Sequence, residues 1–151
     1  MYEFLLVFHS WLRYLVIILA AIVLIKAWQG FMQKKSWDES VEKFSLFFTI
    51  SLDIQLLIGL LLYGIFSPLT KLAFEDFGGA MKDSMLRYWA VEHITIMLIA
   101  IIIAHVGRIK IKKASEDIKK FKAAAVYFTI AVILIIVGIP WPFYSNGRGL
   151  F

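Results

Sequence analysis

Ionisable side chains are the chemically distinctive feature of this sequence, because they lie within long apolar stretches. They are His9, Arg13, Asp53, Glu92, His93 and His105. Such groups are costly inside a membrane, so they usually face the interior of a helix bundle and mark sites of ion, proton or cofactor binding. His9 and His93 suggest haem binding in particular. A neutral imidazole is a good axial ligand of haem iron, and two imidazoles from facing helices can hold the iron from both sides.

The neighbours of these histidines extend the haem hypothesis. Arg13 lies four residues after His9, on the same face of a helix, and from there it could contact a haem propionate. Ser10 and Ala90 are small enough to leave room for the macrocycle. A c-type haem is excluded because the sequence has no Cys and hence no CxxCH motif. We therefore expect haem b, with His9 and His93 as axial ligands and Arg13 as a further contact.

The remaining polar residues allow several interpretations. Arg13 and Asp53 both lie near the middle of their apolar stretches, so an ion pair between them competes with a propionate contact. Glu92 could pair with Arg87 or with Arg13. Gln55 is about 200° around a helix from Asp53 and should face a different neighbour. These residues could form a structural polar network, or a proton-linked or quinone-contacting site near a redox centre.

His105 cannot share the iron of His93. It follows His93 by twelve residues, which is about 18 Å along a helix and about 120° around it. It lies beside Arg108, and we expect it to be an interfacial residue. The alternative is a second haem site, which would need an atypical partner ligand because His9 and His93 lie at a different depth.

The composition indicates an integral membrane protein. Of the 151 residues, 61% are hydrophobic and 18% are charged, whereas a soluble domain has about 45–50% apolar residues. A membrane-spanning helix needs about 20 mostly apolar residues. Four stretches satisfy or nearly satisfy this length, at residues 4–25, 44–66, 88–106 and 123–142. We therefore expect one all-α domain over residues 1–151, an up-down four-helix bundle in the lipid bilayer.

These helices would bring His9 and His93 to similar depths. With helix centres near Tyr14 and Met97, the two histidines lie about 8 Å and about 6 Å from the midplane, on the same side. The first and third helices of an up-down bundle run parallel and are diagonal neighbours, with axes on the order of 11–14 Å apart. That spacing leaves room for an imidazole–iron–imidazole stack between them.

Basic residues predict the orientation of the bundle. The first and third connections, 26–43 and 107–122, carry four and seven Lys or Arg residues, against three in the second connection and one in the tails. The positive-inside rule then places the first and third connections in the cytoplasm and both termini on the outer, periplasmic side. The same rule accounts for the net charge of +5 without a nucleic-acid partner.

Local signals predict where the helices begin and end. Ser36 with Glu39 reads as a capping box for the second helix, and Ser115 is a similar start for the fourth. Pro140 and Pro142 should end the fourth helix. Residues 68–77 suggest a short helix on the outer surface, ended by the glycine pair at 78–79.

Three motifs carry a resemblance to a known group of proteins. They are HSWLRY at 9–14, RYWAVEH at 87–93 and IPWPF…GRGLF at the C-terminus. With them the whole chain resembles small bacterial four-helix membrane proteins labelled cytochrome b-like. The resemblance implies a b-type haem in the bacterial cytoplasmic (inner) membrane, with His9 and His93 at the ligand positions. The chain lacks the larger helix count and the additional ligand pairs of respiratory cytochrome b, which argues against a full quinol-oxidising role.

Three functions are consistent with these features. The first is a haem protein that passes electrons between a membrane carrier and a membrane or periplasmic redox partner, as an electron-transfer protein or a subunit of an oxidoreductase rather than a stand-alone enzyme. The second is a non-enzymatic accessory or assembly subunit of a larger membrane complex. The third is a small proton-conducting or transport protein that uses Arg13, Asp53 and Glu92.

Overall fold

The computed structural model describes residues 1–144 and 147, and this part of the chain is helical and contains no strand. Its α-helices and π-helices (η) are, in chain order, α1 (Tyr2–Met32), α2 (Glu39–Leu61), η1 (Leu62–Phe66), α3 (Pro68–Glu75), α4 (Phe77–Ala80), α5 (Ser84–Arg87), η2 (Tyr88–Glu92), α6 (His93–Lys113), α7 (Asp117–Ala123), η3 (Ala124–Phe128) and α8 (Thr129–Gly138). Four continuous helical stretches are long and apolar enough to cross a membrane, at Tyr2–Met32, Glu39–Phe66, Ser84–Lys113 and Asp117–Gly138. The prediction of an all-α protein with four apolar helices is confirmed.

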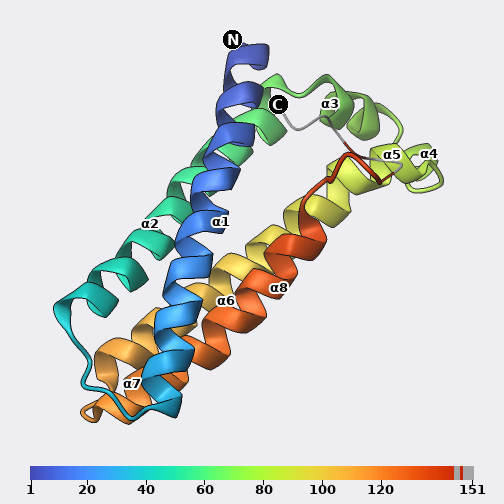
Figure 1. Ribbon diagram of the computed structural model, residues 1–151. Helices are drawn as coiled ribbons and strands as arrows, with labels where there is room; N and C mark the ends of the chain where they lie inside the picture. Colours follow the sequence, from blue (N-terminus) through green and yellow to red (C-terminus); the bar gives the residue numbers. More distant parts are fainter. Residues whose placement is uncertain (145–146, 148–151) are drawn as a thin grey trace.

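The four long helices form a bundle in which neighbours in the chain run in opposite directions (Figure 1). Helix α1 packs against α2 and against α7 and η3, while α6 packs against α2 and α8. Helices α1 and α6 are therefore diagonal to each other, as the sequence predicts. The α1–α2 pair and the α6–α8 pair diverge toward the end where the chain begins, and α3, α4 and α5 cross that end (Figure 1).

Each of the four helices begins before its predicted apolar span, and the first and third also end after it, because polar residues continue the helix outside the apolar segment. The predicted caps of the second and fourth helices are wrong. Asp38, rather than Ser36, caps α2 by accepting a hydrogen bond of 2.9 Å from the backbone N–H of Val41. Glu116, rather than Ser115, precedes the first residue of α7. The fourth helix ends at Gly138 instead of 142, because Pro140 lacks the N–H that another turn would need.

The short surface helix predicted at 68–77 is present as α3, and Ser67 caps it by accepting from the backbone N–H of Thr70. The predicted stop at the glycine pair is wrong. Helix α3 ends at Glu75, and the two glycines belong to the next short helix, α4. Asp76 makes this break possible, because its side chain accepts from the backbone N–H of Gly79 and caps α4.

A seam of buried residues with alternating spacings of three and four holds the bundle together. Such spacing keeps one stripe of each helix facing its neighbours, as in a coiled coil. On α1 the buried residues are Arg13, Val16, Ala20, Val23, Ala27 and Gly30. Buried residues recur in the same way on the other long helices, among them Val41, Ser45, Phe48 and Leu52 on α2, Ala100, Ala104, Gly107 and Ile111 on α6, and Phe121, Phe128 and Ile135 on the fourth.

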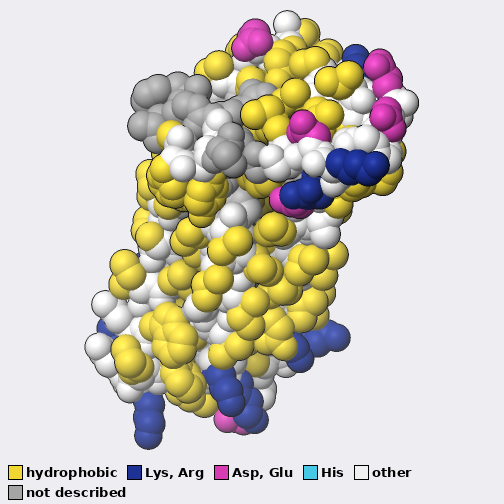
Figure 2. All heavy atoms as spheres, turned by 90° about the vertical axis from the view of Figure 1, so that its right-hand side faces the viewer, with side chains coloured by type: hydrophobic (Ala, Val, Ile, Leu, Met, Phe, Trp, Pro, Cys, Tyr) yellow, Lys and Arg dark blue, Asp and Glu magenta, His cyan; other side chains and the backbone are white. Residues whose placement is uncertain are grey.

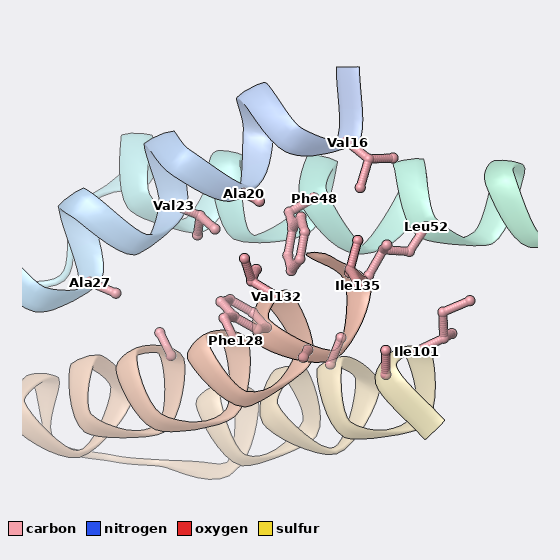
Figure 3. Close-up of a cluster of buried hydrophobic side chains, with 14 of the residues drawn as sticks. Val16, Ala20, Val23, Ala27, Phe48, Leu52, Ile101, Phe128, Val132 and Ile135 are labelled. Carbon is pink, nitrogen blue, oxygen red and sulfur yellow. The ribbon is translucent and has the colours of Figure 1, made fainter. Parts of the chain in front are cut away.

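Small residues let the helices approach closely in the half of the bundle that lies toward α7. Ala27, Ala104 and Ala131 are fully buried there, and helix packing in membranes depends on such close contact. Two aromatic rings fill the centre, since Phe48 and Phe128 meet edge to face with centroids 5.2 Å apart (Figure 3). This half of the bundle is a tightly packed apolar core.

The surface of the bundle agrees with a membrane environment. Hydrophobic side chains cover the middle of the molecule, and Lys and Arg side chains lie toward both of its ends (Figure 2). At that end the buried Arg108 contacts Glu42 and donates to Ser45 Oγ at 3.2 Å, and Glu42 also accepts from the indole N–H of Trp37 at 2.9 Å. These contacts link α2 to α6 at the α7 end of the bundle.

Truncation of the central aromatic pair should destabilise the whole bundle. We expect Phe128→Ala to lower the free energy of unfolding by about 3–5 kcal/mol, the usual cost of removing a buried Phe side chain. Ile133→Ala is the matched control on the same helix, because Ile133 is 55% exposed and such a change should stay within about 0.5 kcal/mol. Equilibrium unfolding in mixed detergent micelles measures both values, and equal effects would contradict the proposed core.

Candidate functional site

A cavity lies at the end of the bundle where the two helix pairs diverge. Its volume is about 150 Å³, and it is partly open to the outside. The cavity is lined mainly by apolar residues, which are Leu6, Val16, Leu52, Leu56, Gly59, Leu60, Leu62, Tyr63, Trp89, Ile94, Met97, Ile101, Ile135, Ile139 and Pro140. Its polar lining residues are His9, Ser10, Arg13, Gln55, Ser67, Thr70 and His93.

The polar residues of this cavity continue the helix seams. On α1 the spacing of three and four runs back from Val16 through Arg13 to His9, and on α2 it runs forward from Leu52 through Gln55 to Gly59. His93 stands at the corresponding place on α6. The seam positions therefore hold small and apolar residues toward α7 and polar residues at the opposite end of the bundle. The same periodicity that packs the core therefore turns these side chains toward one another.

The structure brings His9, His93 and Arg13 to this one cavity, as predicted. The imidazoles come from α1 and α6, the diagonal helices, and both residues line the cavity together with Arg13. Both histidines are half-buried.

A backbone carbonyl fixes the orientation of the His93 ring. The Nδ1–H of His93 donates to the carbonyl oxygen of Gly138, with a distance of 2.8 Å between the atoms. A carbonyl oxygen can only accept, so this contact assigns the proton to Nδ1 and leaves Nε2 with its lone pair. Metal-bound histidines usually have such a partner on the other ring nitrogen. The His93 ring is therefore arranged to act as a ligand through Nε2.

Two prolines leave the acceptors at this end of α8 available. Pro140 and Pro142 have no N–H, so they cannot donate to Ile136 and Gly138, four residues before them. Other donors satisfy both carbonyls. The indole N–H of Trp141 donates to the carbonyl of Ile136 at 2.9 Å. The carbonyl of Gly138 accepts from the hydroxyl of Tyr88 at 2.8 Å as well as from His93.

Close helix packing also positions this carbonyl. A Cβ atom on Gly138 would lie 2.8 Å from a methyl carbon of Ile96 and 2.9 Å from the terminal methyl of Met97. Only a residue without a side chain allows α8 to approach α6 this closely. Because α8 approaches α6 closely at Gly138, the carbonyl of this glycine lies within hydrogen-bond distance of His93 on α6.

His9 has a close backbone neighbour on α2. A Cβ atom on Gly59 would lie 3.2 Å from Cε1 and 3.8 Å from Nδ1 of His9, so the absence of a side chain makes room for the ring. The Nδ1 atom is buried and has no hydrogen-bond partner among the described residues. Gln55, one turn before Gly59, donates its side-chain N–H to the backbone carbonyl of His9 at 3.0 Å. The expectation that Gln55 faces a neighbour other than that of Asp53 is confirmed.

Two π-helical turns, η1 and η2, border the cavity. The second of them immediately precedes His93, and the first contains Tyr63. The hydroxyl of Tyr63 donates to the carbonyl oxygen of Ala90 at 2.7 Å, and so joins the two turns. Isolated π-turns in α-helices occur frequently at functional sites. Here they shift the register of two helices next to the cavity.

Arg13 and Asp53 do not form the ion pair that the sequence offered as an alternative to a propionate contact. Arg13 is buried, lines the cavity, and donates to the hydroxyl of Tyr14 at 3.3 Å. The carboxylate of Asp53 instead pairs with Nε2 of His105 at 2.7 Å. The two side chains point in different directions around their helices. Arg13 lies on the seam of α1 and lines the cavity. Asp53 is the residue after the seam residue Leu52 on α2, and it does not line the cavity.

The other polar residues lie outside the cavity lining. Asp53 and His105 are half-exposed and link α2 to α6 on the flank of the bundle. His105 was expected to be an interfacial residue beside Arg108, and its contact with Asp53 was not predicted. Glu92 forms an ion pair of 2.7 Å with Arg87, one of its two predicted partners, and Arg87 also donates to the carbonyl of Met81.

The sequence interpretation missed three contributors to the site, which are Tyr88, Gly59 and Gly138. The alternating spacing of three and four would have indicated Gly59, since it continues the seam from Leu52 through Gln55. The two prolines indicate unpaired carbonyls at Ile136 and Gly138. Which donors reach those carbonyls depends on how α6 and α8 pack, and that information is not local to either segment.

Comparisons of this chain with models of protein families, with curated proteins and with solved structures find no match.

The contact with Gly138 makes a testable prediction about the His93 ring. In ¹⁵N spectra of the labelled protein at neutral pH, we expect His93 to carry its proton on Nδ1 and to show an unprotonated Nε2. His105 provides an internal comparison, because its Nε2 faces a carboxylate and should be protonated. An Nε2-protonated His93 would contradict the assigned hydrogen bond.

Proposed function

We propose that this chain is a b-type haem-binding membrane protein with a role in electron transfer, and that His9 and His93 are the axial ligands. One observation carries the proposal: two imidazoles from diagonal helices line the same cavity, and one of them has its Nδ1–H satisfied by a backbone carbonyl. When bound, the haem would supply one-electron chemistry at its iron. The residues of the chain would hold and orient it.

The residues of the cavity fit such a group in three respects. The lining supplies two neutral nitrogen donors, which are common axial ligands of haem iron. Most of the lining is aliphatic or aromatic and suits a planar macrocycle. The guanidinium of Arg13 is buried at the cavity, where it would contact an anionic propionate. A low local dielectric makes such a charge contact strong.

The orientation and location follow from charge and helix length. We propose that the α7 end faces the cytoplasm, because the basic connections 26–43 and 107–122 lie there. The cavity would then lie toward the outer face of a bacterial cytoplasmic membrane. A redox partner in that membrane or in the periplasm would approach the haem from this side.

The haem proposal predicts a specific spectrum and a specific mutational pattern. Protein purified from haem-sufficient cells should show a Soret band and a reduced-minus-oxidised difference spectrum typical of b-type haem. We expect His9→Ala or His93→Ala to remove one axial ligand and to abolish or strongly alter this spectrum. Arg13→Gln should retain both ligands but weaken haem retention.

His105→Ala is the matched control, because His105 lies on α6 with His93 but outside the cavity lining. It should leave the spectrum unchanged. Size-exclusion chromatography and helical circular dichroism distinguish loss of haem from loss of folding. A folded wild-type protein that takes up no haem would overturn the proposal, and so would an equal loss in His105→Ala.

The proposed orientation can be tested by labelling, since the sequence has no Cys and single cysteines can be introduced freely. We expect Ser115→Cys, in the connection before α7, to be protected from a membrane-impermeant maleimide added to intact spheroplasts. Asp76→Cys, between α3 and α4, should be labelled. The reverse pattern would invert the proposed topology without affecting the haem site.

A further inference from the structure

Two buried polar atoms lie on facing sides of α1 and α2 without hydrogen-bond partners among the described residues. They are Nδ1 of His9 and Oε1 of Gln55. A buried polar atom without a partner is uncommon and calls for an explanation. Here one atom can carry a proton and the other can accept one. The two unsatisfied groups are chemically complementary.

Gln55 is already held next to His9. Its side-chain N–H donates to the backbone carbonyl of His9 at 3.0 Å, so the amide lies against the residue that carries the imidazole. Its oxygen is bonded to the same amide carbon and therefore remains close to that residue. The terminal torsion of Gln is soft. A rotation of this amide that turns Oε1 toward Nδ1 would exchange the hydrogen bond to the His9 carbonyl for one in which Nδ1–H donates to Oε1.

The position of the His9 ring is consistent with this pairing. Cε1 and Nδ1 are the ring atoms nearest to Gly59, while Nε2 lies more than 4 Å from a Cβ built there. The Nδ1 edge therefore faces α2, which carries Gln55. For Nε2 to bind a metal, Nδ1 must hold the proton, and it then needs an acceptor.

We propose that Gln55 is the positioning residue for His9, with its Oε1 accepting the Nδ1–H of His9 so that Nε2 is presented to the cavity. This inference rests on the proposed haem function. It makes the site asymmetric, because His93 donates to a backbone carbonyl while His9 would donate to a side chain. The potential of the bound haem could then be adjusted by substitution at one residue.

Substitution of Gln55 should shift the reduction potential of the haem in opposite directions. In Gln55→Glu a carboxylate accepts more strongly, increases the electron donation of His9 and should lower the potential. In Gln55→Met the acceptor is lost while the side-chain length is kept, and the potential should rise. Gln33→Glu is the control for the added charge, because Gln33 is exposed at the opposite end of the bundle and should leave the potential unchanged.

Spectroelectrochemical titration of the purified proteins measures these potentials. A residue that only fixed the backbone of His9 would not produce shifts of opposite sign. Unchanged potentials in both Gln55 variants, with haem still bound, would overturn the positioning role and leave the haem site intact.

A second measurement separates this inference from the haem proposal. In ¹⁵N spectra of haem-free protein, His9 should be protonated at Nδ1 in the wild type and should lose this preference in Gln55→Met. If the wild type binds no haem, the proposed function fails, and the spectra still decide whether Gln55 sets the His9 tautomer. Equal tautomer populations in wild type and variant would overturn that role.

Discussion

Close packing of four helices along a repeating seam is the constraint on which the rest of this structure depends. In one half of the bundle, alanine and glycine residues let the helices meet, and the Phe48–Phe128 pair fills the centre. In a membrane such packing must supply much of the association energy, because lipid tails are as apolar as the side chains. The other half keeps the periodicity but changes the residue types. There the seam carries polar residues and the helix pairs diverge (Figure 1). A cavity forms at this place instead of a packed core.

Packing also sets the chemistry of the His93 ring. Pro142 cannot donate to Gly138, Gly138 has no side chain to hold α8 away from α6, and its carbonyl therefore lies within reach of Nδ1. The proton position on a histidine is thus determined by where a neighbouring helix ends. Such an arrangement reduces the reorganisation needed to bind a metal at Nε2, which is the usual benefit of a prearranged site.

The sequence alone predicted the parts of this arrangement that depend on periodicity. The apolar stretches indicated four helices, and counting along them indicated that His9 and His93 would lie at one site between the diagonal helices, where both line the cavity. Contacts that depend on the direction in which a side chain points around its helix were harder to predict from the sequence. The Arg13–Asp53 ion pair, one of two alternatives for Arg13, does not form, because Arg13 lies on the seam of α1 whereas Asp53 lies beside the seam of α2 and pairs with His105. The sequence predicted Ser36 as the cap of α2, and the structure has Asp38. Both residue types are good N-caps, so the path of the preceding connection decides which of them caps the helix.

Electron paramagnetic resonance of the oxidised protein, purified from haem-sufficient cells, tests most directly the proposal that two imidazoles bind one haem iron. If His9 and His93 both bind, the iron has two strong nitrogen ligands and the spectrum should show a single low-spin ferric species. A high-spin species would show that one of the two histidines is not a ligand. Protein that is folded and free of iron would contradict the haem site altogether.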